Sequence, residues 1–301
     1  MPLDDIQRRI CEIVATVQKE IPGGYLAGGG TLQEVLNGDR FSTDIDRFHE
    51  SELEIKSAFK RDNAALESSG LHVQIIEEYS SFIRANVSDD SGGITVVDWA
   101  MDSAFRFFPL EDSVHLGRIL SPFDLATNKT LAMVGRLKIA DWLDMMLCHD
   151  RLQPLGLLAF AACGKDPGFS PSLIVELGAR CTRYAAEELA MIRFRSKPPS
   201  LAALHRKWHR MIDEARAFLE ILPPSEAGQG VMMNDAPFLG SIDECRAALD
   251  DGKIVFRPGR LESVIGIPKP ALVYPGPPEF SPSFEEENSE AEVLRRLRLI
   301  S

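Results

Sequence analysis

Two carboxylates in the stretch AGGGTLQEVLNGDRFSTDIDRF (residues 27–48) have the spacing of a divalent-metal site. Asp44 and Asp46 are two residues apart in a segment, 44–48, whose alternating character predicts a strand. Both side chains then lie on one face, Ile45 between them points into a core, and the acids can share hard cations. Taken alone, a pair of this kind also occurs on solvated acidic faces.

A run of three glycines lies close to this acidic pair. Gly28, Gly29 and Gly30 precede a predicted short helix that opens at Thr31. Backbone N–H groups without side chains, at the positive end of a helix, favour phosphate. A glycine turn is weak evidence by itself, but here it falls within 20 residues of the acids, with Arg40 and Ser42 in between. The combination indicates that metal and phosphate bind together.

Asp98 is a candidate for a third carboxylate. Two-metal phosphoryl transfer usually needs an acid on a neighbouring strand to hold the metal and orient the attacking oxygen. Asp98 lies in the otherwise apolar stretch ITVVDWA (94–100), where an isolated acid is costly to bury unless it is paired or bound to metal. The alternative is that Asp98 sits in solvent at the end of the strand.

The elements that position these residues divide the chain into three parts. The pattern of residues 1–120 predicts a mixed α/β domain. Its expected helices cover 3–20 and Ser51 to about 70, and its expected strands cover 72–79, 81–87 and 93–100. Residues 121–222 predict a helical domain, with helices over 122–136, 139–149, 154–163, 171–194 and 200–221. Residues 223–301 predict a proline-rich C-terminal extension, irregular over 268–284 and ending in a short helix.

Charge and composition exclude some classes of protein. The 301 residues carry a formal net charge of −12, which argues against a general nucleic-acid coating protein. The charge is uneven, because residues 1–150 carry −11 whereas residues 177–216 carry +5. No apolar run is long enough to span a membrane, and the charged N-terminus is unlike a signal peptide, so we expect a cytoplasmic protein without a membrane partner.

These motifs together resemble a known family. The pattern Gly29-Gly30-Thr31, Arg40-x-Ser42-x-Asp44-x-Asp46, Asp98 after a hydrophobic strand, Leu125-x-x-x-Lys129 and Asp141-x-x-Asp144 is similar to the nucleotidyltransferases of the AbiEii/AbiGii toxin family. These belong to the DNA polymerase β-like superfamily. The resemblance covers roughly residues 20–150. It implies an α+β fold, in which a polymerase β-like nucleotidyltransferase domain with a small mixed sheet precedes a helical domain.

The resemblance also implies a role for each matching residue. Asp44 and Asp46 would bind two Mg²⁺ ions, and Asp98 would complete the site as a metal ligand or base. Nucleotide would be bound by five further residues, namely Gly29, Gly30, Arg40, Ser42 and Lys129. Asp141 would act near the nucleotide or the acceptor, and because Ala140 replaces the arginine often found before it, Arg136 or Lys138 would supply that charge. The alternative for Lys129 is a solvated position on its helix.

The expected activity is transfer of a nucleoside monophosphate from a nucleoside triphosphate to an acceptor hydroxyl. The resemblance and the basic segment 177–216 favour RNA, such as a tRNA end, in a toxin-antitoxin or phage-defence role with a cognate antitoxin. Within that segment the basic helix HRKWHR (205–210) could contact RNA, with phosphates on its cations and bases stacked on Trp208. Two alternatives remain: a protein or small-molecule acceptor, and a non-catalytic module that binds nucleotide and acts through protein partners.

Overall fold

A mixed seven-stranded sheet forms the N-terminal part of the protein, for which a computed structural model describes residues 2–20, 23–180 and 184–261. Its strand order is β3-β4-β5-β2-β1-β8-β7, with β2 parallel to β5 and β1 parallel to β8. The strands are β1 (Tyr25–Ala27), β2 (Asp44–His49), β3 (His72–Glu78), β4 (Phe82–Ser88), β5 (Ile94–Met101), β7 (Glu111–Ser113) and β8 (Gly117–Ile119). The mixed sheet expected from the sequence is confirmed, with strand ends shifted by a residue or so.

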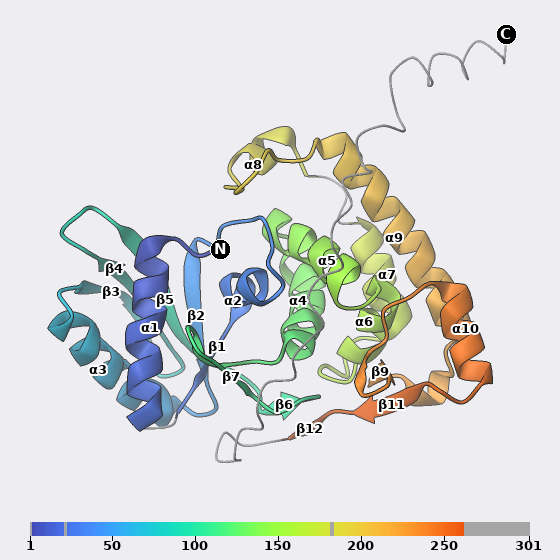
Figure 1. The fold of residues 1–301 in the computed structure, drawn as a ribbon, viewed down its shortest axis with the longest axis horizontal. Coiled ribbons are helices and arrows are strands. Elements are labelled where there is room, and N and C mark those ends of the chain that lie inside the picture. The colour runs from blue at the N-terminus through green and yellow to red at the C-terminus, as the bar shows by residue number, and fades with distance from the viewer. Residues whose placement is uncertain (1, 21–22, 181–183, 262–301) are drawn as a thin grey trace, which may run out of the picture. The chain divides into compact units, whose positions relative to one another are not determined.

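The period-two alternation of the strands gives the sheet two chemically different faces. One face packs against α1 (Asp5–Glu20) and α3 (Glu52–Ser68) and is mainly apolar, apart from a buried ion pair between Arg47 of β2 and Asp62 of α3 (Figure 1). Its buried side chains from the central strands are Ile45, Ile83, Ala85, Val97 and Trp99. The acidic residues of β2 and β5 alternate with these side chains and therefore occupy the opposite face, where α2 (Gly28–Val35) lies.

Helices follow the sheet in chain order. They are α4 (Pro122–Arg136), α5 (Ile139–Arg151), α6 (Leu155–Ala162), α7 (Pro171–Arg180), α8 (Ala186–Ala190) and α9 (Leu201–Ile221). The α4 helix starts where the sequence predicts, because Ser121 Oγ accepts a hydrogen bond from the Asp124 amide and proline takes the first helical position. In Figure 1, α2 lies between the sheet and helices α4 and α5.

The prediction of a single helix over residues 171–194 is wrong. The α7 helix ends at Arg180 and a separate short helix, α8, begins at Ala186. The new start has a local cause, since the Glu188 carboxylate accepts a hydrogen bond from the Ala185 amide at 2.8 Å and so satisfies a donor at a helix N-terminus. The segment after α8 is extended rather than helical, which matters for the site.

Residues 224–261 add a second apolar core. They form η1 (Pro224–Glu226), β9 (Gln229–Met233), β10 (Ala236–Pro237), α10 (Ile242–Asp250), β11 (Val255–Pro258) and β12 (Arg260–Leu261). This core joins Val231, Phe238 and Cys245 to Phe160 of α6 and Phe218 of α9. The β12 strand returns to pair with β6 (Phe105–Arg106).

The described part of the expected extension is thus folded against the helices, and the domain limits at 120 and 222 stay a prediction. The irregular stretch 268–284 and the terminal helix expected beyond it lie outside the described residues. Within the described ranges, no helix combines the length and the apolar character that a membrane crossing requires.

Candidate active site

Three carboxylates lie on the face of the sheet where α2 packs, on two neighbouring strands. Asp44 and Asp46 share a face of β2, as their spacing predicts, and the parallel register places Asp46 directly beside Asp98 of β5. Asp98 is only 6% exposed, so the alternative of a solvated strand end is wrong. Strand register, which the sequence does not specify, is what brings the third acid to the first two.

Crowding of like charges is visible in the protonation of Asp46. Burial, followed by the neighbouring Asp44 and Asp98 carboxylates, raises its pKa from 3.8 to about 7, although Lys129 and Arg136 act in the opposite direction. A carboxylate with this pKa is held in an unfavourable place unless a cation joins it. The oxygen-only donor set of Asp44, Asp46 and Asp98 is chemically suited to Mg²⁺.

The N-terminus of α2 touches the acidic cluster. The helix begins at Gly28, earlier than the Thr31 expected from the sequence, and Gly28 has a φ of +72° that disfavours other residues. A Cβ atom at Gly28 would lie 1.7 Å from Asp46 Oδ2, so glycine is required for the carboxylate to approach the helix. Gly29 and Gly30 follow in the first turn and are buried.

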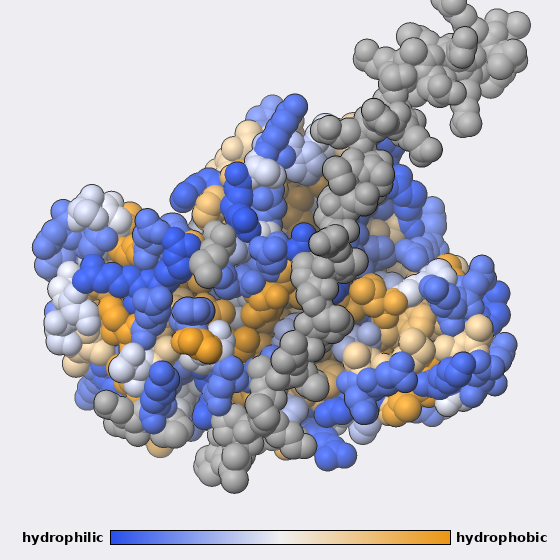
Figure 2. Space-filling view, in the orientation of Figure 1, coloured by the Kyte–Doolittle hydropathy of each residue, from blue (hydrophilic) through white to orange (hydrophobic). Residues whose placement is uncertain are grey.

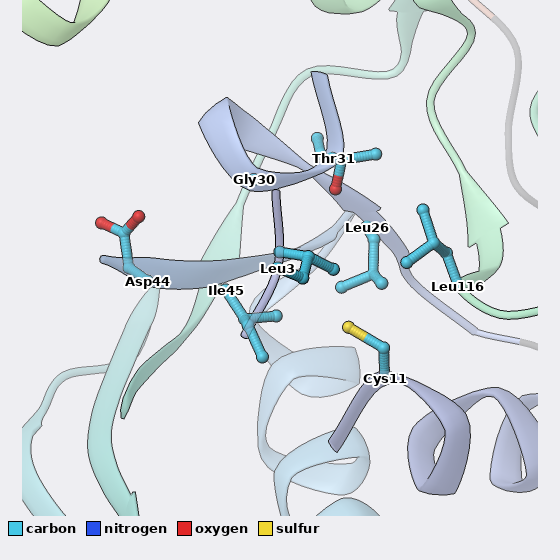
Figure 3. Close-up of a pocket in the computed structure, with 9 residues that line it drawn as sticks. Leu3, Cys11, Leu26, Gly30, Thr31, Asp44, Ile45 and Leu116 are labelled. Carbon is cyan, nitrogen blue, oxygen red and sulfur yellow. The ribbon is translucent and has the colours of Figure 1, made fainter. Parts of the chain in front are cut away.

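Ser42 links the glycine helix to the acids. Its hydroxyl donates to Asp44 Oδ1 at 3.1 Å, and its Cβ lies 3.2 Å from where a Cβ on Gly30 would be. Figure 3 shows a small pocket lined mainly by apolar side chains such as Leu3, Leu26 and Ile45, with the Asp44 carboxylate pointing away from them. Its volume of about 10 Å³ matches a single water, so a nucleotide does not fit there.

Arg84 of β4 is a site residue that the sequence analysis missed. It lies directly opposite Asp98 in the antiparallel register of β4 and β5. Its Nε donates to Asp98 Oδ1 at 2.8 Å and its Nη2 to Asp98 Oδ2 at 2.7 Å, a two-pronged ion pair. The only available sequence signal was a lone arginine in SFIRANV, which strand alternation would place on the polar face of the sheet.

A buried network of ion pairs lies on the other side of α2. Lys129 Nζ of α4 is 2.8 Å from Asp141 Oδ1 and 3.1 Å from Asp144 Oδ2, both on α5. Asp144 also accepts two hydrogen bonds from Arg40, at 3.0 and 2.9 Å, and Asp141 accepts two from Arg136, at 2.7 and 2.9 Å. Five charges therefore alternate in sign along one chain of contacts.

This network changes the interpretation of Lys129. It is 6% exposed, so the solvated-helix alternative is wrong. Burial acts to lower its pKa, but Asp144 and Asp141 outweigh burial and hold the pKa above its ordinary value, so Lys129 stays charged. Of the two cations considered for Asp141, Arg136 makes the pair, and its side chain remains 52% exposed.

The network reaches the glycine helix through Gly29. A Cβ at Gly29 would lie 2.8 Å from Arg40 Nη2, 3.4 Å from Asp144 Oδ2 and 3.7 Å from Lys129 Nζ. The first turn of α2 thus has the three acids on one side and a cation-rich network on the other. A triphosphate placed at this turn would have metal ligands at one end and positive charge at the other, an arrangement suited to phosphoryl transfer.

The loop that carries Arg40 and Ser42 is fastened by a distant segment, residues 193–196, which we call the strap. The Phe41 amide donates to the Arg193 carbonyl at 2.9 Å, and the Arg195 amide donates to the Asp39 carbonyl at 2.8 Å. The Arg193 guanidinium also lies over the Phe41 ring. Figure 2 shows hydrophilic and apolar residues side by side in the region of α8, and Arg193 and Arg195 of the strap are exposed.

The basic helix expected to contact RNA is only partly available. Trp208 of α9 is fully buried, and its indole N–H donates to the Gly178 carbonyl at 3.0 Å, so the expectation that it stacks with bases is wrong. Lys207 forms an ion pair with Asp150. Arg206 and Arg210 are exposed and can meet phosphate.

The similarity of this chain to known proteins lies in its fold. Neither a protein-family model nor a curated protein matches the sequence. Among solved structures, the chain is similar to MenT4, a nucleotidyltransferase toxin from Mycobacterium tuberculosis, at 16% identity over 71% of this chain and 82% of that chain, with a TM-score of 0.54. JHP933 from Helicobacter pylori matches 72% of this chain and 95% of its own at 17% identity, with a TM-score of 0.46. The α+β architecture expected from the sequence is confirmed, and the chain has the fold of a nucleotidyltransferase.

Proposed function

We propose that this protein is a Mg²⁺-dependent nucleotidyltransferase that moves a nucleoside monophosphate from a nucleoside triphosphate to a hydroxyl group of RNA. One observation carries the proposal: the β2 and β5 register sets Asp46 beside Asp98, on the face where the glycine turn of α2 begins. The similarity in fold to MenT4 supports the same class of reaction.

Each residue has a chemical role in this proposal. Asp44 and Asp46 would hold two Mg²⁺ ions and Asp98 would complete the site, and bound Mg²⁺ would supply positive charge next to the phosphoryl oxygens. The backbone of Gly29 and Gly30, with Ser42, contacts the triphosphate. Arg40, Lys129 and Arg136 supply positive charge around it, with Arg136 the most accessible of the three.

Every bond and proton of the proposed transfer can be followed. The acceptor oxygen forms a bond to the α-phosphorus, the bond from the α-phosphorus to the bridging oxygen breaks, and pyrophosphate leaves with the electron pair. The proton of the acceptor hydroxyl goes to a carboxylate oxygen of Asp98. Asp141 lies within the ion-pair network, so we assign it to positioning Lys129 and Arg136 beside the nucleotide.

The same proposal includes RNA as the acceptor, a toxin role with a cognate antitoxin, and a cytoplasmic location. The exposed cations Arg206 and Arg210, together with those of the strap, support a polyanionic acceptor in a protein that is otherwise acidic. The fold of a nucleotidyltransferase toxin supports the toxin role.

The deciding experiment supplies each nucleoside triphosphate, labelled at the α-phosphate, with Mg²⁺, total RNA and purified protein. Label on RNA supports the proposal, label on protein or on a small molecule moves the acceptor to those classes, and nucleotide binding without transfer favours a non-catalytic module. The Asp44→Ala and Asp46→Ala variants should fold and lose transfer. Turnover retained in either variant would contradict the assignment of the metal site.

A further inference from the structure

We propose that Arg84 is an internal cation that competes with divalent metal for the carboxylate of Asp98. This inference rests on the proposed function, because it concerns how the same acidic cluster is loaded. It assigns Arg84 as a positioning residue, which holds Asp98 in the resting site and releases it when metal binds.

The geometry of the pair carries the first step. Both oxygens of Asp98 accept from the guanidinium, at 2.8 and 2.7 Å, and the Asp98 side chain is only 8% exposed. A fork that engages both oxygens leaves the carboxylate committed to Arg84. Among the residues that the structure describes, no three acidic, histidine or cysteine side chains are arranged to hold a metal ion. The three acids share a face, yet Asp98 is turned to the arginine.

The surroundings of Arg84 allow it to leave. Its side chain is 37% exposed, and its other contacts are weak: Glu77 at 3.8 Å and the ring of Phe82 at 5.2 Å. A guanidinium is not deprotonated in proteins, so Arg84 always carries its charge. Release must therefore occur by displacement, and a divalent cation is the natural competitor for a carboxylate.

The competition has a physical rationale in the crowding of the cluster. Asp46 lies between Asp44 on its own strand and Asp98 on the neighbouring strand, so three carboxylates crowd one face of the sheet. Arg84 offsets one of these charges while no metal is bound. Metal binding therefore exchanges one counterion for another, and its affinity is lowered by the strength of the pair that it breaks.

The test measures Mn²⁺ affinity without nucleotide, by titration calorimetry and by paramagnetic resonance of free Mn²⁺. The variants are Arg84→Gln, which removes the competing charge, and Arg84→Lys, which keeps the charge but loses the fork. The matched control is Arg216→Gln, since Arg216 makes a similar two-pronged pair with Glu176 on the helices, at 2.9 and 3.2 Å. We expect Arg84→Gln to bind Mn²⁺ about tenfold more tightly, corresponding to about 1.4 kcal/mol.

Arg84→Lys should fall between wild type and Arg84→Gln, and Arg216→Gln should match wild type. Equal or weaker binding in Arg84→Gln overturns the proposal, and if that variant does not fold, equal or weaker binding in Arg84→Lys does so. Asp46→Asn separates this failure from failure of the proposed function. If Asp46→Asn abolishes Mn²⁺ binding while the Arg84 variants match wild type, the metal site stands and the competition does not exist. If wild type binds no Mn²⁺, both proposals fail.

Discussion

Asp46 should make the metal-free protein less stable as the pH rises, and replacing it with asparagine should remove this penalty. The folded-state pKa of about 7 lies above the ordinary 3.8, so the folded state holds the proton more tightly than the unfolded state does. The stability contributed by this proton is fully present below pH 3.8 and is lost as the pH rises through 7. Asp46→Asn mimics the protonated form at every pH.

The magnitude follows from the same pKa values. The difference between 3.8 and about 7 sets an upper limit of about 4 kcal/mol at pH 8. Part of the Asp46 side chain is accessible to solvent, and its charge is coupled to that of Asp44 and Asp98, so we expect a gain of about 2 kcal/mol. At pH 4 the variant and the wild type should be nearly equal.

The assay is urea denaturation in the presence of a chelator at pH 4, 6 and 8, followed by circular dichroism. Asp112→Asn serves as the control, because Asp112 is on β7 of the same sheet but is 61% exposed. Its stability should stay within about 0.5 kcal/mol of wild type. The reasoning is refuted if Asp46→Asn is no more stable than wild type at pH 8, or if its advantage is the same at all three pH values.

Three further changes have defined outcomes. Lys129→Met should lower the free energy of unfolding by about 2 kcal/mol in urea denaturation, because it removes a partner from buried Asp144. It should also raise the nucleotide dissociation constant measured by calorimetry. Wild-type values in both assays would show that Lys129 contributes little to stability or to nucleotide binding. Gly28→Ala should destabilise the protein more than Gly92→Ala in the same assay, since both have positive φ but only Gly28 meets Asp46; equal losses would contradict the close approach. RNA binding measured against salt should show a slope flatter by about one unit per lost contact when Arg206 and Arg210, the exposed cations of α9, are replaced with glutamine. An unchanged slope would move the acceptor surface elsewhere.

Local signals in the sequence predict most of the fold and part of the site. Ser121 with Pro122 marks the start of α4, and Ser51 caps α3, because capping depends on residues within one turn. The shared face of Asp44 and Asp46 follows from the period of a strand in the same way. The Glu54 carboxylate adds a second local contact at this helix start, because it accepts a hydrogen bond from the Glu50 amide.

The parts that could not be predicted depend on which segments meet. Arg84 is brought to Asp98 by the register of β4 and β5, and a shift of one residue would have turned it to the apolar face. The burial of Trp208 depends on α7, whose Gly178 carbonyl receives its indole N–H. The same holds for Lys129, whose solvated and buried alternatives differ only in whether α5 lies against α4.

The strap has a consequence for how the protein is made. A chain synthesised as far as residue 120 already contains all three carboxylates, but the loop with Arg40 and Ser42 still lacks Arg193 and Arg195, which fasten it from about 150 residues further along the chain. Contacts of such long sequence separation form late, after the local elements. Arg193 and Arg195 leave the ribosome only when most of the protein has been made, so a nascent chain carries the three acids before the loop of Arg40 and Ser42 is fastened.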